Sequence, residues 1–176
     1  MSTLPIRVFG DPVLATPTQP VLEIDGRLAS LVDSMIETMY DAPGVGLAAN
    51  QVGINRRLFV YDKGEGPVVV INPVLVESTG TWVFEEGCLS VPGHSWEIER
   101  PNQVHVRGFD IEGTELDLQV DEFEGRILQH ELDHLDGILL VERLDDEQRR
   151  EAKRMLRQGV LRQRADPDGL RQLLDD

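Results

Sequence analysis

The sequence predicts an α+β fold in which antiparallel β-sheets pack around a central metal-binding helix, with an N-terminal helix and a C-terminal helix. An amphipathic helical pattern comes first, short β-rich runs follow, and two further helical segments come last. Helices and strands are therefore grouped along the chain instead of alternating. That order is typical of α+β proteins and not of parallel βαβ folds.

The first helix is expected to follow Asp25 and to reach about Tyr40. Aspartate is a common N-cap residue, and the proline and glycine within residues 41–44 end the segment. Apolar residues recur along this segment with helical spacing, so one face of the helix is expected to lie in the core. That face consists of Leu28, Leu31, Val32, Met35, Ile36 and Met39.

The β-rich runs come next, and a hairpin turn is expected at residues 110–113, Asp-Ile-Glu-Gly. Strands are expected at residues 57–61, 68–71, 74–77, 82–84, 104–109 and 114–120. The second helix should begin after Asp121, with that residue or a close neighbour as its N-cap, and end near Gly137.

A basic C-terminal helix is expected at about residues 146–164, opened by acidic residues that suit the positive end of the helix dipole. The tail, residues 166–176, is expected to fray. Between residues 149 and 164 the helix carries seven cations and a single acid, Glu151. These cations could either form a solvated surface or dock on an anionic partner. These cations are Arg149, Arg150, Lys153, Arg154, Arg157, Arg162 and Arg164.

Length and composition favour one domain over residues 1–176, because the chain of 176 residues has 40% apolar residues and no dividing linker. No apolar run is long enough for a bilayer span or a secretory signal, so a soluble, cytoplasmic protein without a membrane partner is expected. The net charge of -15 argues against nucleic-acid binding by the body of the protein.

Residues 130–134, His-Glu-Leu-Asp-His, carry the strongest chemical signal. On a helix, His130 and His134 lie one turn apart on the same face, so both imidazoles can bind one metal ion. Glu131 lies beside them, where a carboxylate can move protons on water that the metal activates. The motif therefore predicts metal-assisted hydrolysis.

A catalytic metal needs a third protein ligand, and Cys88 is the candidate because it is the only thiol in the chain. Glycine and proline surround it in residues 85–93, which suggests a strand that is interrupted near a close backbone approach. The alternative is that Cys88 is a small buried hydrophobic residue. That alternative would leave the two histidines short of a ligand.

Residues 44–51, Gly-Val-Gly-Leu-Ala-Ala-Asn-Gln, match the pattern G-x-G-x-x-A of dinucleotide-binding loops. The context argues against that function, because a helix and Pro43 precede the glycines and no long helix can follow them. A better interpretation is a backbone open to an extended peptide, followed by the buried amide of Gln51, which can donate to an oxyanion.

Three segments together resemble, in order and spacing, the signature motifs of peptide deformylases. They are residues 44–51, residues 86–90 (Glu-Gly-Cys-Leu-Ser) and residues 129–134 (Gln-His-Glu-Leu-Asp-His). Each segment is short, but the combination is highly specific. The resemblance extends from residues 6–14 to about Leu144.

This resemblance implies a metal-dependent hydrolase that removes the formyl group from the N-terminal formylmethionine of new polypeptides and releases formate. It implies Cys88, His130 and His134 as ligands of one divalent ion. In that family the ion is usually Fe²⁺, and Zn²⁺, Ni²⁺ or Co²⁺ can replace it. A ligand set of this kind suits several first-row metals.

The resemblance also implies roles for residues around the metal. Glu131 would be the catalytic acid and base, and Gln51 and the Leu89 backbone N–H would polarise the formyl carbonyl. The substrate would lie as an added strand between Val45–Gly46 and the edge at Gly87. Its methionine side chain would enter a pocket formed by Val45, Phe84, Phe123, Ile127 and His130.

The sequence departs from the family pattern at two places. Asn50 precedes the glutamine where proline or another residue often stands, and no consequence follows from it. Residues 93–97 belong to a variable stretch, so His94 and Trp96 could line the mouth of the cleft or be a surface histidine and a half-buried aromatic residue.

Two other functions fit part of the sequence. One is an HExxH metallopeptidase that cleaves peptide bonds, although such enzymes usually take a third ligand downstream and no histidine follows His134. The other is a non-catalytic module stapled by a metal, whose basic C-terminal helix binds the ribosome. Ribosome binding through residues 149–164 is also compatible with catalysis.

Overall fold

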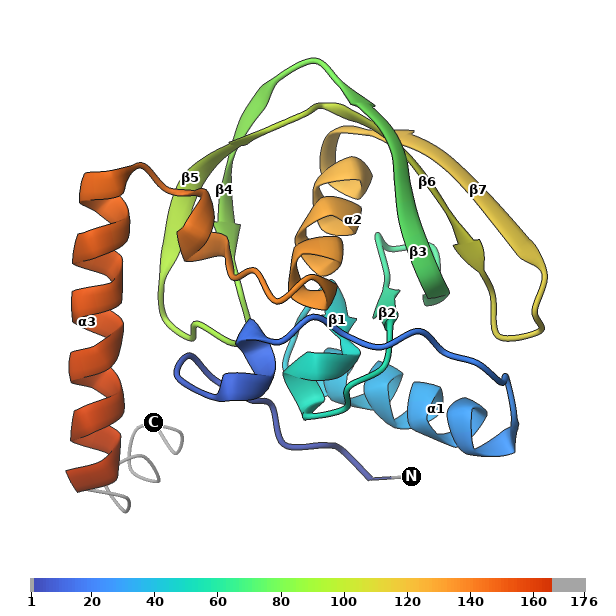
Figure 1. Ribbon diagram of the computed structural model, residues 1–176, viewed down its shortest axis with the longest axis horizontal. Coiled ribbons are helices and arrows are strands. Elements are labelled where there is room, and N and C mark those ends of the chain that lie inside the picture. Colours follow the sequence, from blue (N-terminus) through green and yellow to red (C-terminus); the bar gives the residue numbers. More distant parts are fainter. Residues whose placement is uncertain (1, 166–176) are drawn as a thin grey trace. The chain divides into compact units, whose positions relative to one another are not determined.

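The structure is a computed structural model that describes residues 2–165 (Figure 1). In chain order the elements are η1 (Pro12–Ala15), α1 (Gly26–Asp41), β1 (Gly46–Ala48), η2 (Ala49–Val52), β2 (Leu58–Tyr61), β3 (Val68–Thr79), β4 (Trp82–Gly87), β5 (Ser95–Arg100), β6 (Gln103–Phe109), β7 (Glu115–Asp121), α2 (Glu122–Leu135), η3 (Leu140–Arg143) and α3 (Asp146–Ala165), where η marks a short 3-10 helix. The predicted α+β class is confirmed.

The chain groups into two compact units, one ending at Leu140 and the other beginning at Val141. The expectation of one domain over residues 1–176 therefore stays a prediction. In the first unit, five strands form an antiparallel sheet in the order β1-β2-β3-β6-β7, while β4 and β5 form a separate antiparallel pair. Figure 1 shows α2 in the middle of this unit, with β4 and β5 on one side and β3, β6 and β7 on the other.

Helix α1 forms as predicted. Asp25 is its N-cap and accepts a hydrogen bond from the Leu28 N–H at 2.9 Å. The predicted apolar face packs into a core that also contains residues of β1, η2, β2 and β3. Its buried members are Leu28, Val32, Met35 and Met39, while Leu31 and Ile36 are half-buried.

Strand β3 is continuous, although the sequence predicted two strands from this stretch. The break expected at Asn72 and Pro73 is a bulge, because pairing with β6 shifts in register after Ile71. Asn72 has a φ angle of 50°, which asparagine tolerates better than most residues, and its side-chain amide exchanges two hydrogen bonds with the backbone of Val21. A bulge bends a strand without ending it, so the sheet continues past the proline.

Two strands were missed from the sequence. β1 has only three residues, too few for a periodic pattern. In β5, Trp96 and Ile98 alternate with polar residues and are more buried than their neighbours, so alternation could have revealed this strand. Strand β4 also extends past its predicted end to Gly87, so that Cys88 follows the strand directly.

Helix α2 follows β7 without a loop. Asp121 precedes the helix as predicted, but its side chain makes no capping hydrogen bond, and the first helical residue, Glu122, has a positive φ angle of 47°. Apolar residues of α2 pack against the five-stranded sheet. They are Ile127, Leu128, Leu132 and Leu135.

In the second unit, α3 occupies residues 146–165, in agreement with the predicted basic helix. Asp145 caps it, because its carboxylate accepts hydrogen bonds from the backbone N–H groups of Glu147 and Gln148. The predicted frayed tail, residues 166–176, lies outside the described residues. Among residues 2–165, no helix is both long and apolar enough to cross a lipid bilayer.

Replacing Asp25 with alanine is expected to lower the free energy of unfolding by about 1 kcal/mol, because the Leu28 N–H loses its acceptor. Urea denaturation measures the change. Asp33→Ala is the control, because Asp33 is exposed on the same helix, and it should change stability by less than about 0.5 kcal/mol. Equal losses in the two variants would contradict the assigned cap.

Candidate metal centre

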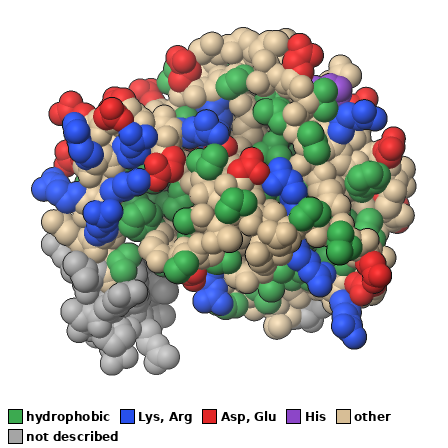
Figure 2. Space-filling model, in the orientation of Figure 1, with side chains coloured by type: hydrophobic (Ala, Val, Ile, Leu, Met, Phe, Trp, Pro, Cys, Tyr) green, Lys and Arg blue, Asp and Glu red, His purple; other side chains and the backbone are tan. Residues whose placement is uncertain are grey.

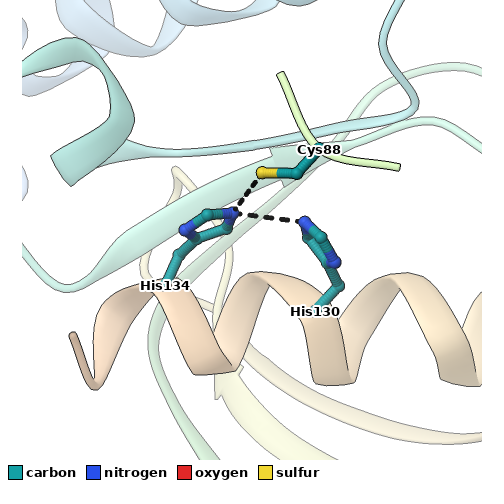
Figure 3. Close-up of side chains that lie close together, drawn as sticks. All are labelled: Cys88, His130 and His134. Carbon is teal, nitrogen blue, oxygen red and sulfur yellow. Dashed lines mark hydrogen bonds between the residues drawn. The ribbon is translucent and has the colours of Figure 1, made fainter. Parts of the chain in front are cut away.

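Helix α2 carries His130 and His134 one turn apart on one face. Their imidazole rings lie 4.9 Å apart between centroids at an angle of 72°, and their Nε2 atoms are 3.2 Å apart (Figure 3). His134 is buried and His130 is nearly so. The helical spacing recognised in the sequence therefore brings both ring nitrogens to one point.

Cys88 reaches the same point from the end of β4. Its Sγ lies 3.2 Å from His134 Nε2, and the ligand atoms of all three residues lie within 4.8 Å of one another. In a tetrahedral zinc site with ordinary bond lengths, ligand atoms are separated by about 3.3 to 3.7 Å. The chain therefore has a Cys/His/His metal site with the three ligands typical of catalytic centres. The described residues contain no other group of this kind.

The sulfur is oriented by groups that donate to it. The Ser90 N–H is 3.4 Å from Cys88 Sγ, and Gln51 Nε2 is 3.7 Å away. The Val91 N–H also donates to the Cys88 carbonyl at 2.9 Å, which closes a turn directly after β4. This turn aims the cysteine at the helix.

Glu86 supports His130 from β4. Its Oε2 lies 3.1 Å from His130 Nδ1, and Arg100 donates to both carboxylate oxygens, at 2.6 and 3.0 Å. Arg100 also donates to Asp133 on α2 at 2.7 Å. Glu86, Arg100 and Asp133 are all buried, so these charges pair with one another away from water.

The electrostatics of Glu86 determine which nitrogen of His130 is available. Burial alone would raise the pKa of Glu86, but the hydrogen bonds from His130 and Arg100 lower that pKa to about 2. A charged carboxylate can only accept, so His130 Nδ1 carries the hydrogen and Nε2 is left to bind a metal.

Glu131 is buried beside the two histidines. Burial is the main cause that raises its pKa to about 7, and the neighbouring His130 acts in the opposite direction. Its Oε2 has no hydrogen-bond partner among the described residues. Strand β1 passes so close that a Cβ at Gly46 would lie 2.3 Å from Glu131 Oε1, so a larger residue there would displace the Glu131 carboxylate from its present position.

Gln51 lies in η2 and is also buried. Its Oε1 accepts from the Ala48 N–H at 2.8 Å, and its Nε2 donates to Ser90 Oγ at 3.1 Å. These contacts fix the amide so that its NH₂ group faces the Cys88 side. The neighbouring Asn50 donates from Nδ2 to the His134 carbonyl, which ties η2 to the end of α2.

A pocket opens beside the three ligands, and it is largely apolar at its walls. Phe84 and Phe123 meet edge to face at 6.0 Å between ring centroids, and each ring remains partly exposed. All the residues that the sequence assigned to the substrate line this pocket, together with Gln51, Leu89, His130 and Glu131. They are Val45, Gly46, Phe84, Gly87, Phe123 and Ile127.

The variable stretch after Cys88 also reaches the pocket. His94 and Ser95 line it, and the His94 ring stacks on Trp96 at 5.8 Å between centroids. Ser95 Oγ donates to Glu85 Oε1 at 2.5 Å. His94 is therefore an exposed histidine that also lines the pocket, whereas Trp96 is half-buried and does not line it.

Four buried charged or polar residues of the site were missed from the sequence. Glu86 and Asp133 lie within the recognised motifs, two residues before Cys88 and one before His134, so their positions were a usable signal. No sequence signal marked Arg100 or Arg126, because only the fold brings these two residues to Glu86.

Comparison with known proteins agrees with this geometry. A family model described as polypeptide deformylase matches residues 3–150. The peptide deformylase of Agathobacter rectalis is 48% identical over 145 residues, covering 82% of this chain and 92% of the relative. The enzyme of Acidothermus cellulolyticus is 46% identical over 158 residues, covering 90% of this chain and 88% of the relative.

Solved structures show the same likeness in three dimensions. The peptide deformylase of Thermotoga maritima superposes with a TM-score of 0.80 at 46% identity, covering 81% of this chain and 98% of that one. The peptide deformylase of Ehrlichia chaffeensis in complex with actinonin has a TM-score of 0.86 at 35% identity, covering 90% of this chain and 98% of that one. Ligand chemistry, sequence and fold agree, and the chain belongs to the polypeptide deformylase family.

Proposed function

We propose that Cys88, His130 and His134 hold the divalent ion with which this deformylase removes the formyl group from the N-terminal formylmethionine of nascent polypeptides and releases formate. The observation that carries the proposal is the convergence of one sulfur and two ring nitrogens at the wall of a pocket that Glu131 also lines. Three ligands from two different elements support an open, catalytic site over a closed structural one.

Fe²⁺ is the ion we propose, with Zn²⁺, Ni²⁺ or Co²⁺ able to replace it. One thiol and two imidazoles suit several first-row metals, so the preference for iron rests on membership in the family. Bound there, such an ion supplies Lewis acidity and a nucleophilic water at neutral pH. Metal analysis of protein purified without oxygen identifies the ion.

The chain's own residues then handle the protons and the developing charge. Glu131 accepts a proton from the attacking water and returns one to the departing amine nitrogen, a role that its burial beside the ligands supports. Gln51 and the Leu89 backbone N–H donate to the formyl oxygen as negative charge grows on it. Each such donor is typically worth about 10² to 10³ in rate.

The pocket supports methionine as the side chain that is held during the reaction. Its apolar wall is formed by Val45, Phe84, Phe123 and Ile127, which suit an unbranched thioether. The peptide backbone would lie as an added strand between Gly46 and Gly87, where the absence of side chains leaves main-chain groups accessible.

The alternatives fit less well. A metallopeptidase of the HExxH type would need a downstream ligand, whereas the three clustered ligands include the upstream Cys88. A metal-stapled module would need a fourth ligand, and the group of ligands in the described chain has three members. Neither alternative accounts for the match to the deformylase family.

We also propose that α3 docks the enzyme on the ribosome, which places it in the cytoplasm where nascent chains emerge. Figure 2 shows Lys and Arg side chains gathered over α3. Arg149, Lys153 and Arg154 pair with acids of the same unit. Arg150 and Arg157 are exposed and make no ion pair within the described residues, so both remain available for phosphate.

Wild-type protein should release formate from formyl-Met-Ala-Ser and leave an internally quenched peptide uncut. Glu131→Gln should keep the metal but lower kcat by at least about 10²-fold, because the amide cannot accept the proton. The assay is formate release, with metal content measured on the same sample. Glu99→Gln, an exposed change on β5, is the control. A Glu131→Gln variant that keeps wild-type activity would contradict the proposed role of Glu131 in proton transfer.

Glu86→Gln should weaken metal binding by about 10- to 100-fold, because His130 Nδ1 and Arg100 lose the charge that orients them. Competition with a chromogenic chelator measures the affinity. Glu85→Gln, on the neighbouring exposed position of β4, is the control. Equal affinity in Glu86→Gln and wild type would contradict the orienting role.

Arg150→Glu combined with Arg157→Glu should abolish co-sedimentation with ribosomes at low salt, because two charges on the exposed surface of α3 change sign and the net charge falls by four units. Gln148→Glu with Gln158→Glu adds acids to the same helix without removing a cation, and it should reduce binding much less. Circular dichroism checks that both variants keep the helix. Unchanged binding of the arginine variant would refute docking through α3.

A further inference from the structure

We propose that Arg126 is a positioning residue that determines which substrate side chains the pocket accepts. Its guanidinium contacts the rings of Trp82 and Phe84 and also binds the carboxylate of Glu86, which orients His130. This inference rests on the proposed function, since it concerns the selectivity of the same pocket. No pattern in the sequence pointed to Arg126.

Arg126 lies on α2, one turn before His130, and its side chain is only 3% exposed. Its Nη1 donates to Glu86 Oε1 at 2.9 Å and to the Ile98 carbonyl at 2.8 Å, and its Nη2 donates to the Trp82 carbonyl at 2.5 Å. One guanidinium therefore joins α2 to both β4 and β5. These two strands make no hydrogen-bonded ladder with the five-stranded sheet, and these side-chain hydrogen bonds tie them to the helix.

The guanidinium also supports the aromatic wall. Its central carbon lies 5.2 Å from the Trp82 ring centroid and 6.0 Å from that of Phe84. Trp82 and Phe84 lie 4.8 Å apart, and Phe84 meets Phe123 at 6.0 Å. Phe84 and Phe123 are both partly exposed, so solvent restrains neither ring on its open side, and the planar cation is a buried contact on the other side of the Trp82–Phe84 pair.

A purely structural role for Arg126 explains these contacts less completely. Arg100 already binds Glu86 and ties it to Asp133 on α2. Arg126 adds contacts on the pocket side, and its Nε is buried without a partner in the described chain. An unsatisfied buried donor costs stability, so the placement of this guanidinium is better explained by what it does to the pocket wall.

The two arginines offer a matched comparison. Arg126 lines the pocket, whereas Arg100 does not, yet both are buried and both bind the same carboxylate. Replacing either with lysine keeps the charge and removes the planar fork. Loss of the fork at Arg126 frees Phe84 to move, and the pocket should then admit side chains that it normally excludes.

The experiment measures kcat/KM for formyl-Met-Ala-Ser and formyl-Phe-Ala-Ser on one preparation of each variant. The ratio of the two constants does not depend on the folded or metal-loaded fraction, because that fraction cancels. Arg126→Lys should lower the ratio by about tenfold relative to wild type. Arg100→Lys should leave the ratio within twofold of the wild-type value, even where it lowers both constants.

Binding provides a readout that does not depend on turnover. In a Glu131→Gln background, calorimetry should show the same loss of preference for the methionine peptide when Arg126→Lys is added. Trp82→Leu is a second variant, because it removes the ring under the guanidinium and leaves Glu86, Arg100 and Arg126 unchanged. It should also lower the ratio of the two kcat/KM values. If Arg126→Lys does not fold, Trp82→Leu alone tests the role of Arg126.

A wild-type enzyme that releases no formate from formyl-Met-Ala-Ser would overturn the proposed function itself. An active wild type whose ratio is unchanged in Arg126→Lys, or in Trp82→Leu where the lysine variant does not fold, would overturn the role of Arg126 alone. An equal fall of the ratio in Arg100→Lys would also overturn it, because the effect would then belong to Glu86 and not to the pocket wall.

Discussion

The buried carboxylate of Glu86 is the contact on which the metal site depends. It lies on β4, and it receives hydrogen bonds from His130 and Arg126 on α2 and from Arg100 on β5. The β4–β5 pair is not hydrogen-bonded to the larger sheet, so these side-chain contacts determine where Cys88 lies relative to the histidines. A buried charge is tolerated only when it is paired and hydrogen-bonded, and here every partner also serves the site.

Close packing around Glu131 is the second constraint. The carboxylate is buried, and its pKa is raised because burial disfavours its charged form. Strand β1 passes beside it at residue 46, where a side chain larger than that of glycine would displace the Glu131 carboxylate. The glycine segment, which the sequence predicts to be a backbone open to a peptide, therefore also leaves room for the Glu131 carboxylate.

Much of the fold could be predicted from the sequence, because periodicity and capping are local properties. The bounds of α1 followed from Asp25 and from the apolar face of the helix, and those of α2 from its start after Asp121 and its end before Gly137. Local sequence patterns did not predict strands whose presence or length depends on hydrogen bonding to a neighbouring strand. β3 continues through Asn72 and Pro73 because its partner β6 accommodates a bulge, and β1 is a strand only because β2 lies beside it.

The sequence by itself determined the metal ligands and the family, since two histidines one turn apart and one cysteine in a recognisable motif have a local signature. Only the tertiary structure decided how they are held. Arg126 follows Glu86 by 40 residues and Asp133 follows Arg100 by 33, and no periodicity links positions so far apart. Ion pairs of this kind form when packing removes water from both partners, so they can be seen only after the chain has folded.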